Sequence, residues 1–567
     1  MPKDSQQGLF PYVFPDIRDW PLYKLYQDRE VFINEVCNES VENILYDKDN
    51  DKLNSEIASV LYQERSRIKQ MPWRVDPADE EVFWRGVKKS LVSKSLDDAP
   101  DEQAEANNKD LVEQIVRRYT EEIAGNFEIS TYRFARTALT NLFGIMLRPF
   151  TISFLSKYLI GTPNLNEKIQ VLGDLATIRE LSKKGTVVVV PTHFSNLDSI
   201  LIGWCVDRIG LPALSYGAGL NLYNTRIFGY FFGRLGAYTV DRRKKNSFYL
   251  ATLKAFSRIS IFRGSHTLFF PGGTRARSGE LESKLKMGLL GTVIDAQCDN
   301  YTTDKKEKIF IVPLVLNYHF VLEAKGLIEQ FLANTGKELY LVDNRNFGGT
   351  KNLIKFLWQF FYKSSEIVVN FGKPMDVLGN MVDVNGQSFD SNGEPIDLTD
   401  YFKKQGGEIN FDRQRNEQYT QKLANHIVDR FHKENVVLTS HLVAFAAFNW
   451  LEVFYNQLDL YGILRLSKEE CVIPAAVFKL AVAHLLKQLF VLEAEGKVQL
   501  SKHLKADSLE AIIENGLANL GAFHPQKPLI KNAKTGDIET QDINLLFYYQ
   551  NRLEGYKLNL KKLKINH

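Results

Sequence analysis

The sequence predicts an α/β fold, a mainly parallel sheet flanked by helices, with a helical region on its N-terminal side and another on its C-terminal side. Short apolar runs typical of buried strands occur at 186–190, 266–270, 309–316 and 366–370. Helical stretches lie between them, such as 199–206 and 285–296. Strands that alternate with helices favour a parallel sheet that is buried on both faces.

We divide the chain into four regions. Residues 1–130 form a helical N-terminal region, and its acidic stretch at 95–110 lacks large apolar residues, which predicts a solvated loop or linker. Residues 131–375 hold the α/β domain. Residues 376–412 are predicted to be a β-hairpin insertion, since Asn-Gly pairs typical of tight turns stand at 385–386 and 392–393. Residues 413–567 form a helical C-terminal domain.

The composition restricts the class of protein. A chain of 567 residues with 44% hydrophobic residues is ordinary for a globular protein with more than one domain. A net charge of +3 gives no strong general attraction to nucleic acid. The four cysteines lie far apart without C-x-x-C spacing, so neither a disulfide scaffold nor a zinc site is expected, and a reducing compartment fits.

The hydropathy pattern indicates no strong membrane span. The first twenty residues contain acidic side chains and no apolar core, so they do not read as a secretory signal. The stretches 209–225 and 435–451 are the longest candidate spans, and neither is a good one. We therefore expect a soluble or peripheral protein.

Several common catalytic motifs are missing from the sequence. It has no G-x-S-x-G, no G-x-x-x-x-G-K-[ST] and no H-E-x-x-H. The stretch GAGLNL at 217–222 lacks the third glycine of a dinucleotide-binding fingerprint. The sequence thus disfavours serine hydrolases with a G-x-S-x-G nucleophile elbow, P-loop enzymes and zinc proteases with an H-E-x-x-H motif.

His193 and Asp198 follow the strand-like run that ends at Pro191. Five positions on a continuous helix turn through about 500°, so the two side chains would diverge. They meet only if His193 lies in a turn and Asp198 in the first helical turn, with Ser195 or Asn196 as the cap. The carboxylate would then hold one imidazole nitrogen, and the other would be a general base. The alternative is a solvated loop histidine.

Two further stretches carry arginines that suit a phosphate. FFGRLGAYTVDRR at 231–243 includes Arg242, whose forked guanidinium fits phosphate, although a solvated charge run fits equally well. In TLFFPGGTRARSGEL at 267–281, a strand-like run enters the Gly272-Gly273 turn, where backbone N–H groups can approach an anion. The polar residues that follow this turn are Thr274, Arg275, Arg277, Ser278 and, at the next helix, Lys286.

The fourth stretch, IVPLVLNYHFVLEA at 311–324, contains Pro313 and Tyr318 and by itself indicates only a core strand. Taken in order, the four stretches resemble the four sequence blocks of the glycerolipid acyltransferase superfamily. The resemblance covers about 186–317, roughly a quarter of the chain. It implies the acyltransferase fold.

The resemblance also implies roles for these residues. His193 would be the catalytic base and Asp198 its orienting partner, and Arg242 would bind the phosphate of the acceptor. The other expected phosphate ligands are Arg275, Arg277 and Lys286. Backbone groups of the loop would stabilise an oxyanion, at Gly272, Gly273 and Thr274. The fourth block, with Pro313 and Tyr318, is associated with the acyl donor.

Two stretches indicate a branch of the superfamily. NYHFVLEA at 317–324 and NVVLTSHLVAFAAF at 435–448 are similar to the glycerol-3-phosphate and dihydroxyacetone-phosphate acyltransferases. This implies transfer of a fatty acyl group from acyl-CoA or acyl-acyl-carrier-protein to glycerol 3-phosphate in phospholipid biosynthesis, with no metal or redox cofactor. One alternative is a 1-acylglycerol-3-phosphate acyltransferase that makes phosphatidate. Another is a non-catalytic lipid-binding scaffold on the same fold.

Gly272 departs from the family pattern, which has a glutamate at this position. That carboxylate is implicated in placing the acceptor or the loop. Its absence implies an altered acceptor, compensation by another carboxylate such as Glu280, or lost activity.

The product of such a reaction is amphiphilic, so we expect peripheral docking on the cytoplasmic face of a membrane. Candidate contacts are 141–160, 226–234, 353–363 and 556–565, the last with Lys557, Lys561, Lys562 and Lys564 among leucines. Each of these stretches fits equally well as a local packing element. Acyl carrier protein is a partner if it carries the donor, and no nucleic acid partner is expected.

Overall fold

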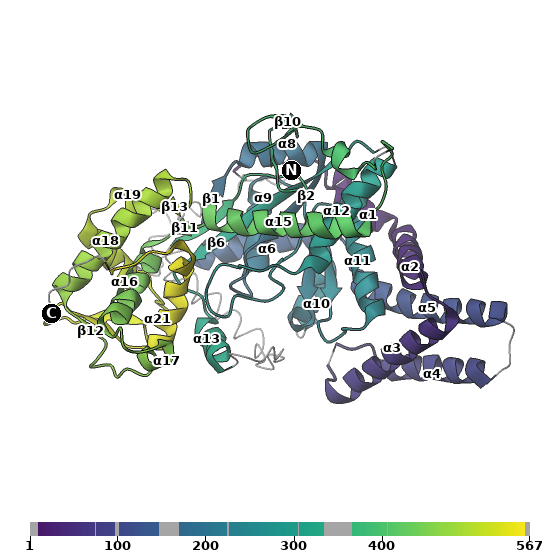
Figure 1. Ribbon diagram of the computed structural model, residues 1–567, viewed down its shortest axis with the longest axis horizontal. Coiled ribbons are helices and arrows are strands. Elements are labelled where there is room, and N and C mark those ends of the chain that lie inside the picture. The colour runs from purple at the N-terminus through teal and green to yellow at the C-terminus, as the bar shows by residue number, and fades with distance from the viewer. Residues whose placement is uncertain are drawn as a thin grey trace, which may run out of the picture.

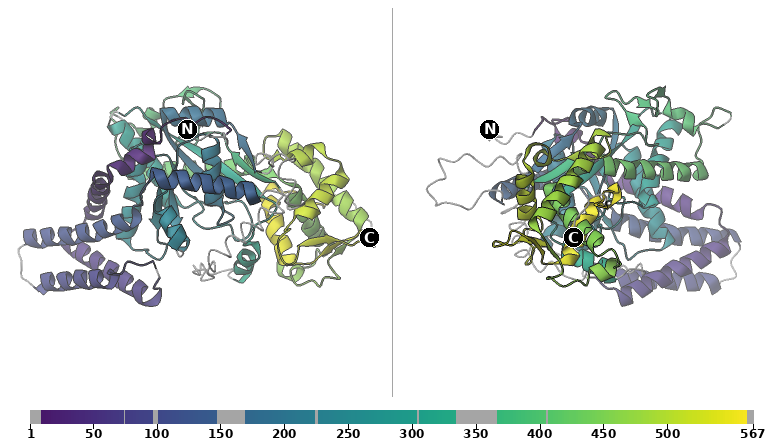
Figure 2. Two further views of the ribbon diagram at one scale, coloured as in Figure 1. Left: turned by 180° about the vertical axis from the view of Figure 1, so that it is seen from behind. Right: turned by 60° about the vertical axis from the view of Figure 1, so that its left-hand side comes forward.

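The computed structural model describes residues 9–561 except 74, 97–100, 147–168, 224–225, 304, 334–365 and 405. A central sheet lies between an N-terminal helical arm and a C-terminal helical lobe (Figure 1). Figure 2 shows the same three parts from behind and from the side of the C-terminal lobe.

In the described part of the chain, seven strands form the central sheet in the order β1-β7-β6-β2-β5-β3-β4. Their bounds are β1 Ile169–Gly173, β2 Gly185–Pro191, β3 Ser215–Gly219, β4 Ala237–Val240, β5 Thr267–Leu268, β6 Lys308–Tyr318 and β7 Ile367–Phe371. Neighbouring strands run parallel except β6 and β7, which are antiparallel. The predicted fold class is therefore confirmed. The four predicted runs overlap β2, β5, β6 and β7, although β5 includes only two residues of the run at 266–270.

Helices cover both faces of this sheet, which explains why β2 and β6 are buried almost throughout. Helix α15 crosses the face turned toward the viewer in Figure 1, and α6 crosses the opposite face, as Figure 2 shows. The helices around the sheet are α6 Ile129–Met146, α8 Leu175–Lys184, α9 Asp198–Arg208, α10 Arg226–Phe232, α11 Ser247–Phe262, α12 Met287–Thr302, α13 Ala324–Ala333 and α15 Arg413–Lys433, with the short η3 Leu220–Tyr223.

The N-terminal region is helical as far as the structure describes it. After η1 Ile17–Asp19, α1 Pro21–Gln27 and α2 Arg29–Leu45, the N-terminal arm consists of α3 Asn50–Gln70, α4 Glu80–Leu96 and α5 Asp101–Ile123. The prediction of a loop at 95–110 was wrong from Asp101 onward, because this acidic stretch opens α5. Acidic side chains are favourable near a helix N-terminus, and alanine, glutamine and glutamate have high helix propensity.

The predicted hairpin insertion is a three-stranded meander of β8 Met381–Val382, β9 Ser388–Phe389 and β10 Pro395–Ile396. Both Asn-Gly pairs stand in its turns, where Gly386 has φ +79° and Gly393 has φ +85°. These left-handed conformations suit glycine, which is why the turn prediction succeeded. The helix η4 Leu398–Phe402 follows.

The C-terminal lobe, residues 436–560, is mostly helical, with one two-stranded sheet and one three-stranded sheet. Its bounds are β11 Val436–Val437, α16 Thr439–Phe454, α17 Leu460–Ile463, β12 Val472–Ile473, α18 Ala475–Ala494, β13 Gln499–Leu500, α19 Lys502–Ala506, α20 Leu509–Asn519, β14 Leu529–Lys531, β15 Ile538–Thr540, α21 Ile543–Gln550 and η5 Asn551–Tyr556. Helix α16 occupies most of the 435–451 candidate span and is buried along most of its length, so it is a core helix.

Helix α18 is, among the described residues, the one helix long and apolar enough to cross a membrane by length and composition. Only a minority of its residues are buried. Leu485 and Leu489 are buried, whereas Leu480 and Val491 are exposed, so the helix packs with only one side in the core. Core helices of soluble proteins share this composition, so it is weak evidence for a membrane span.

The apolar core is continuous from the sheet into the C-terminal lobe. One buried cluster includes Val189 of β2, Leu316 of β6, Phe448 of α16 and Leu546 of α21. A second cluster joins the N-terminal helices to α11, through residues such as Trp84 and Phe256. The limits of the four predicted regions remain a prediction.

A buried ionic network holds the N-terminal arm against the start of α11. Arg67 of α3 donates from Nε to Glu64 at 2.7 Å and also contacts Glu80 of α4. Glu64 in turn accepts from the Tyr119 hydroxyl at 3.0 Å and from Asn246 Nδ2 at 2.7 Å. Asn246 caps α11 by accepting from the backbone N–H of Tyr249. Because Arg67 and Glu64 have almost no exposed side-chain area, each carboxylate depends on these partners.

Arg67→Ala is expected to lower the free energy of unfolding by about 3–5 kcal/mol, because it leaves the buried carboxylate of Glu64 without its cation. Urea unfolding followed by circular dichroism measures the change. Arg85→Ala, which removes a distant contact to Glu81 from an arginine that is 78% exposed, is the matched control. It should change the free energy by no more than about 0.5 kcal/mol. Equal effects of the two substitutions would contradict a network role for Arg67.

Candidate active site

The sheet topology gathers the four sequence blocks. Strands β6, β2, β5, β3 and β4 run parallel, so their carboxyl ends share one edge of the sheet. His193 follows β2, Gly272 follows β5, Arg242 follows β4 and Tyr318 ends β6. Loops at the carboxyl ends of such strands are where α/β proteins build their sites.

Asp198 is the first residue of α9 and has no exposed side-chain area. Four donors from the described residues converge on its carboxylate: Oδ2 accepts from His193 Nδ1 at 2.9 Å, Phe194 N at 2.7 Å and Ser195 N at 2.9 Å, and Oδ1 accepts from the Tyr318 hydroxyl at 2.7 Å. A buried charge needs such partners. The turn before α9 is thus closed on the carboxylate, as the five-residue spacing requires if the pair is to meet.

The contact with Asp198 fixes the state of the His193 ring. A carboxylate only accepts, so Nδ1 must carry the proton, and Nε2 presents its lone pair. The ring stacks on Phe270, with centroids 4.0 Å apart, and its side chain is 13% exposed. An oriented neutral imidazole of this kind can take a proton from a hydroxyl at Nε2.

Tyr318 and Pro313, both predicted for the acyl-donor region, occupy different positions. The Tyr318 hydroxyl lies on Asp198, and burial together with that negative charge raises the pKa of Tyr318 well above its usual value. It therefore stays protonated and donates. Pro313 lies inside β6, in register with Val190 of β2.

The Gly272-Gly273 loop is attached to the histidine turn. Gly273 has φ +74°, and its N–H donates to Phe270 O at 3.0 Å, which closes the turn. The N–H of Ala276 donates to His193 O at 2.7 Å. Lys286, exposed at the start of α12, donates its backbone N–H to Pro271 O at 2.7 Å.

Arg275 and Arg277 leave this loop close to the histidine turn. Arg275 Nη1 donates to Glu323 Oε1 at 3.4 Å, and the Arg275 side chain is 16% exposed. Arg277 is also partly exposed. The loop therefore places the Arg275 guanidinium and the backbone of residues 274–277 beside the turn that carries His193.

The charged residues that follow β4 differ in burial. Arg243 is buried and pairs with Asp76 and Asp241, and Lys244 is buried against Glu122. Arg242 lies between them in sequence but is exposed. Arg242 is thus the arginine of this run that a dissolved anion can reach.

Glu323 is a site residue that the sequence analysis missed. Its carboxylate accepts from Ser195 Oγ and Asn196 N, both at 3.0 Å, as well as from Arg275. It therefore ties the histidine turn to the arginine loop. The available sequence indication was an acidic residue just past the strand, in NYHFVLEA.

Glu282 and Arg552 were also missed. Glu282 Oε1 accepts from His193 N at 2.8 Å, and burial raises the pKa of Glu282 to about 7. The guanidinium of Arg552 lies over the Phe194 ring, with its carbon 3.6 Å from the centroid, and burial lowers the pKa of Arg552 to about 10. Both side chains lie directly beneath the histidine turn.

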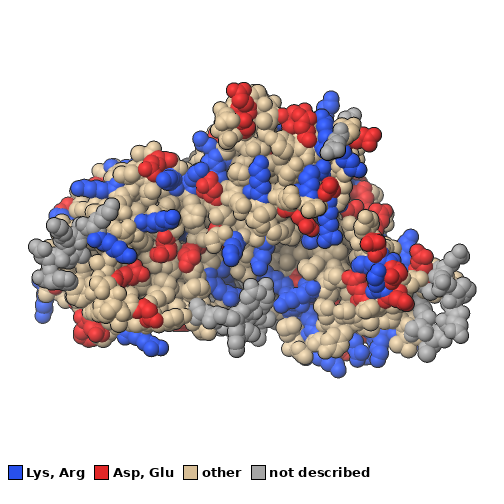
Figure 3. All heavy atoms as spheres, viewed as in Figure 1, with Lys and Arg blue, Asp and Glu red and all other residues tan. Residues whose placement is uncertain are grey.

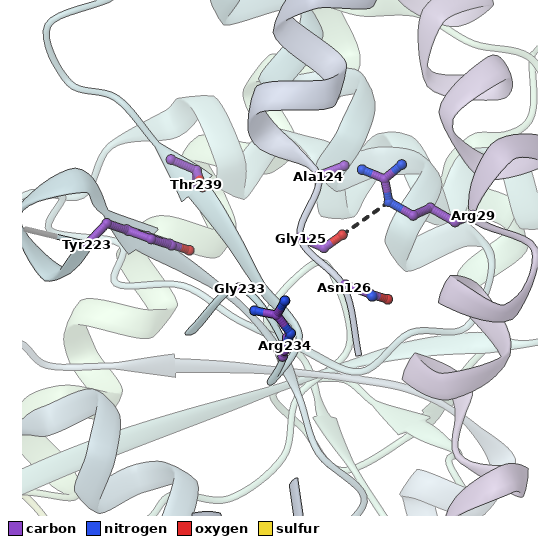
Figure 4. Close-up of a pocket in the computed structure, with 8 residues that line it drawn as sticks. All are labelled: Arg29, Ala124, Gly125, Asn126, Tyr223, Gly233, Arg234 and Thr239. Atoms are coloured by element: carbon purple, nitrogen blue, oxygen red, sulfur yellow. Dashed lines mark hydrogen bonds between the residues drawn. The ribbon is translucent and has the colours of Figure 1, made fainter. Parts of the chain in front are cut away.

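The cavities found near the N-terminal arm do not contain this site. One, of about 350 Å³, is lined by Arg29, Arg234 and neighbours that Figure 4 shows around the hydrogen bond from Arg29 Nε to Gly125 O. A second, of about 300 Å³, adjoins it at Tyr223 and Thr239 and reaches Lys244. Neither is lined by His193. Proton transfer from a hydroxyl requires the oriented His193–Asp198 pair, so we place the candidate site at the carboxyl edge of the sheet.

The chain thus has an α/β fold whose carboxyl sheet edge carries the His193–Asp198 pair. A family model described as Acyltransferase matches residues 174–317, which include His193, Asp198, Arg242 and Arg275. This part of the chain is therefore similar to acyltransferases.

Curated relatives are similar to part of the chain. Glycerol-3-phosphate acyltransferase of Pseudomonas paraeruginosa (strain DSM 24068 / PA7) is 24% identical over 274 residues, which are 48% of this chain and 29% of the relative. The protein of that name from Baumannia cicadellinicola subsp. Homalodisca coagulata is 28% identical over 211 residues, 35% of this chain and 23% of the relative. The chain thus spans less than a third of the length of these relatives.

Among solved structures, the chain is similar to the 1-acyl-sn-glycerophosphate (LPA) acyltransferase, PlsC, from Thermotoga maritima. The match has 12% identity and covers 67% of this chain and 96% of that chain. Its TM-score is 0.24, which is below the level that supports a common fold.

Tyr318→Phe is expected to lower the free energy of unfolding by about 1.5–3 kcal/mol, because it removes a buried hydrogen bond to a charged group. Chemical unfolding measures the change. Tyr556→Phe is the matched control, since it removes a hydroxyl whose partners are both neutral: it donates to the carbonyl of His432 and accepts from Asn435 Nδ2. It should cost about 1 kcal/mol. A smaller effect at Tyr318 than at Tyr556 would show that the Asp198 contact contributes little.

Proposed function

We propose that this protein transfers a fatty acyl group from an acyl thioester to glycerol 3-phosphate. The observation that carries the proposal is the His193–Asp198 contact at 2.9 Å, at the sheet edge where the arginine loop is attached to the histidine turn. The names of the curated relatives support the choice of acceptor. The donor is acyl-CoA or acyl-acyl-carrier-protein, and neither a metal nor a redox cofactor is required.

The proposed reaction is a direct displacement. His193 Nε2 removes the proton from the acceptor hydroxyl while its oxygen attacks the thioester carbonyl. Asp198 stabilises the imidazolium through Nδ1, and backbone N–H groups of the loop at Gly272 and Thr274 face the developing oxyanion. The N–H of Gly273, which was also predicted for this role, is used instead to close the turn on Phe270 O. The C–S bond then breaks, and Nε2 returns the proton to the thiolate. The products are the acyl ester and the free thiol.

The acceptor phosphate is held by cations around the same edge. Arg275 and Arg277 come from the loop after β5, Arg242 comes from the end of β4, and Lys286 begins α12. Figure 3 shows Lys and Arg side chains gathered around a hollow in the middle of one face, between α10 and the C-terminal lobe. We propose that the phosphate enters from this face.

The nearest alternative is transfer to a 1-acylglycerol 3-phosphate, which uses the same chemistry with a larger acceptor. The second alternative is a lipid-binding scaffold without catalysis, suggested by Gly272. The complete set of contacts around Asp198 argues against the scaffold, because a non-catalytic protein has no need for an oriented imidazole.

Peripheral docking on the cytoplasmic face of a membrane belongs to this proposal. Of the predicted contacts, 353–363 and most of 141–160 lie outside the described residues. In the C-terminal stretch Leu558 and Leu560 are buried, so these leucines pack internally, while Lys557 and Lys561 are exposed. In α10, Tyr230 is 51% exposed and remains a candidate contact.

Acyl transfer from labelled acyl-CoA or acyl-acyl-carrier-protein to glycerol 3-phosphate, dihydroxyacetone phosphate and lysophosphatidate tests the function. We expect the highest kcat/KM with glycerol 3-phosphate, and a loss on the order of 10³-fold or more in His193→Ala, which lacks the base. An unchanged unfolding midpoint of that variant is the control. Preference for lysophosphatidate would favour the alternative enzyme, and no transfer to any acceptor would refute the function.

Arg277→Ala is expected to raise the KM for glycerol 3-phosphate about 10- to 100-fold, because a charge-assisted hydrogen bond to phosphate is lost. The KM for the acyl donor should stay within about twofold. Lys284→Ala removes an exposed cation seven residues further along and serves as the matched control. If both substitutions raise the KM for glycerol 3-phosphate equally, the phosphate is held by the general positive field of the site and not by a specific contact with Arg277.

A further inference from the structure

We propose that Glu282 supplies the carboxylate that position 272 lacks, and that it is a positioning residue acting through the backbone of His193. The inference rests on the proposed function, since it concerns the same site. On this view the carboxylate has moved from position 272 to position 282, so Gly272 does not indicate lost activity.

The space around Gly272 carries the proposal. A Cβ built at Gly272 would lie 3.0 Å from Glu282 Cγ, 3.3 Å from Oε1 and 3.6 Å from Cδ, and these are the nearest atoms around it. Two C–C bonds of about 1.5 Å place the carboxyl carbon of a glutamate roughly 2.5 Å from its own Cβ. The side chain of a glutamate at 272 is therefore long enough to reach the region that the carboxyl group of Glu282 occupies. Glycine at 272 is what leaves room for Glu282.

The contact that Glu282 makes there is with the catalytic turn. Its Oε1 accepts the N–H of His193 at 2.8 Å, while the carbonyl of the same residue accepts from Ala276 N at 2.7 Å. The backbone of His193 is thus held on both sides by the loop segment 276–282. With Asp198 fixing the ring, these contacts set where Nε2 points.

The charge of Glu282 has a counterpart from the C-terminal lobe. Oε2 of Glu282 and Nη1 of Arg552 are both buried atoms without a hydrogen-bond partner, and each group feels the charge of the other. Arg552 Nη2 donates to Leu316 O at 3.2 Å, which anchors the guanidinium beneath the turn. A buried carboxylate is tolerated at this position because a buried cation stands nearby.

Glu280, the other acidic residue of the loop, does not occupy this position. None of the three atoms nearest to a Cβ at Gly272 belongs to Glu280. Burial and the charge of Glu554 raise the pKa of Glu280. Among these two glutamates, the geometry selects Glu282.

Moving the carboxylate between the two positions tests the inference. We compare wild type, E282A, E282Q, E280A and the double variant G272E/E282A by kcat and KM for both substrates. E282A should lower kcat about 10- to 100-fold, because a displaced base loses its alignment with the hydroxyl. The KM for the acyl donor should stay within about twofold. E282Q retains an oxygen that can accept the His193 N–H and should lose less than about fivefold.

The double variant G272E/E282A should regain at least tenfold in kcat over E282A, a rescue that a purely structural loss would not show. The inference is overturned if E282A is as fast as wild type, if E280A is the slow variant, or if the folded double variant is as slow as E282A. If E282A fails to fold, recovery of folding and turnover in G272E/E282A supports the exchange, and failure of both overturns it. A wild-type protein without acyl transfer would instead refute the proposed function.

Discussion

The carboxylate of Asp198 is the point on which the site depends. It is fully buried, so its charge must be balanced by donors that the fold brings to it. Two of them are backbone N–H groups of the turn before α9, one is the imidazole of His193, and one is the hydroxyl of Tyr318 at the end of β6. One interaction therefore sets the shape of the turn, the tautomer of the histidine and the packing of β6 beside β2.

How far the sequence predicts the fold follows from the length and composition of each strand. The valine run of β2 and the apolar run of β6 are long and buried on both faces, so the pattern reveals them. Strand β3, with the sequence SYGAG, and the four-residue β4 contain no apolar run, so the pattern did not reveal them. They are strands because they pair with each other, and β3 also pairs with β5. The helix at 101–110 was missed for a different reason, since acidic composition was taken as a mark of a loop.

The contacts of the candidate site also differ in how far the sequence predicts them. The His193–Asp198 pair is local, so its spacing alone defined the condition under which the two meet. Glu282, Glu323 and Arg552 reach the turn from 89 to more than 350 positions away, and no local pattern marks such contacts. The charge run at 241–245 shows that even adjacent residues of the same type can differ in a way that the sequence does not predict. Its members look alike in sequence, yet Arg243 and Lys244 are committed to buried carboxylates while Arg242 is exposed.

The C-terminal lobe is a structural part of this site. Asn551 Nδ2 donates to Ser278 O at 2.8 Å, and the backbone of Gly279, at φ +87°, lies so close to Tyr548 O that a Cβ would be 2.1 Å from it. At the end of β6, Tyr318 O accepts from Nε2 of His441 in α16, whose Nδ1 accepts from Leu438 N. Backbone carbonyls that are buried where the lobe meets the sheet require hydrogen-bond donors. The lobe satisfies them, and with Arg552 it also supplies a cation next to Glu282, so the histidine turn is built by residues from both halves of the chain.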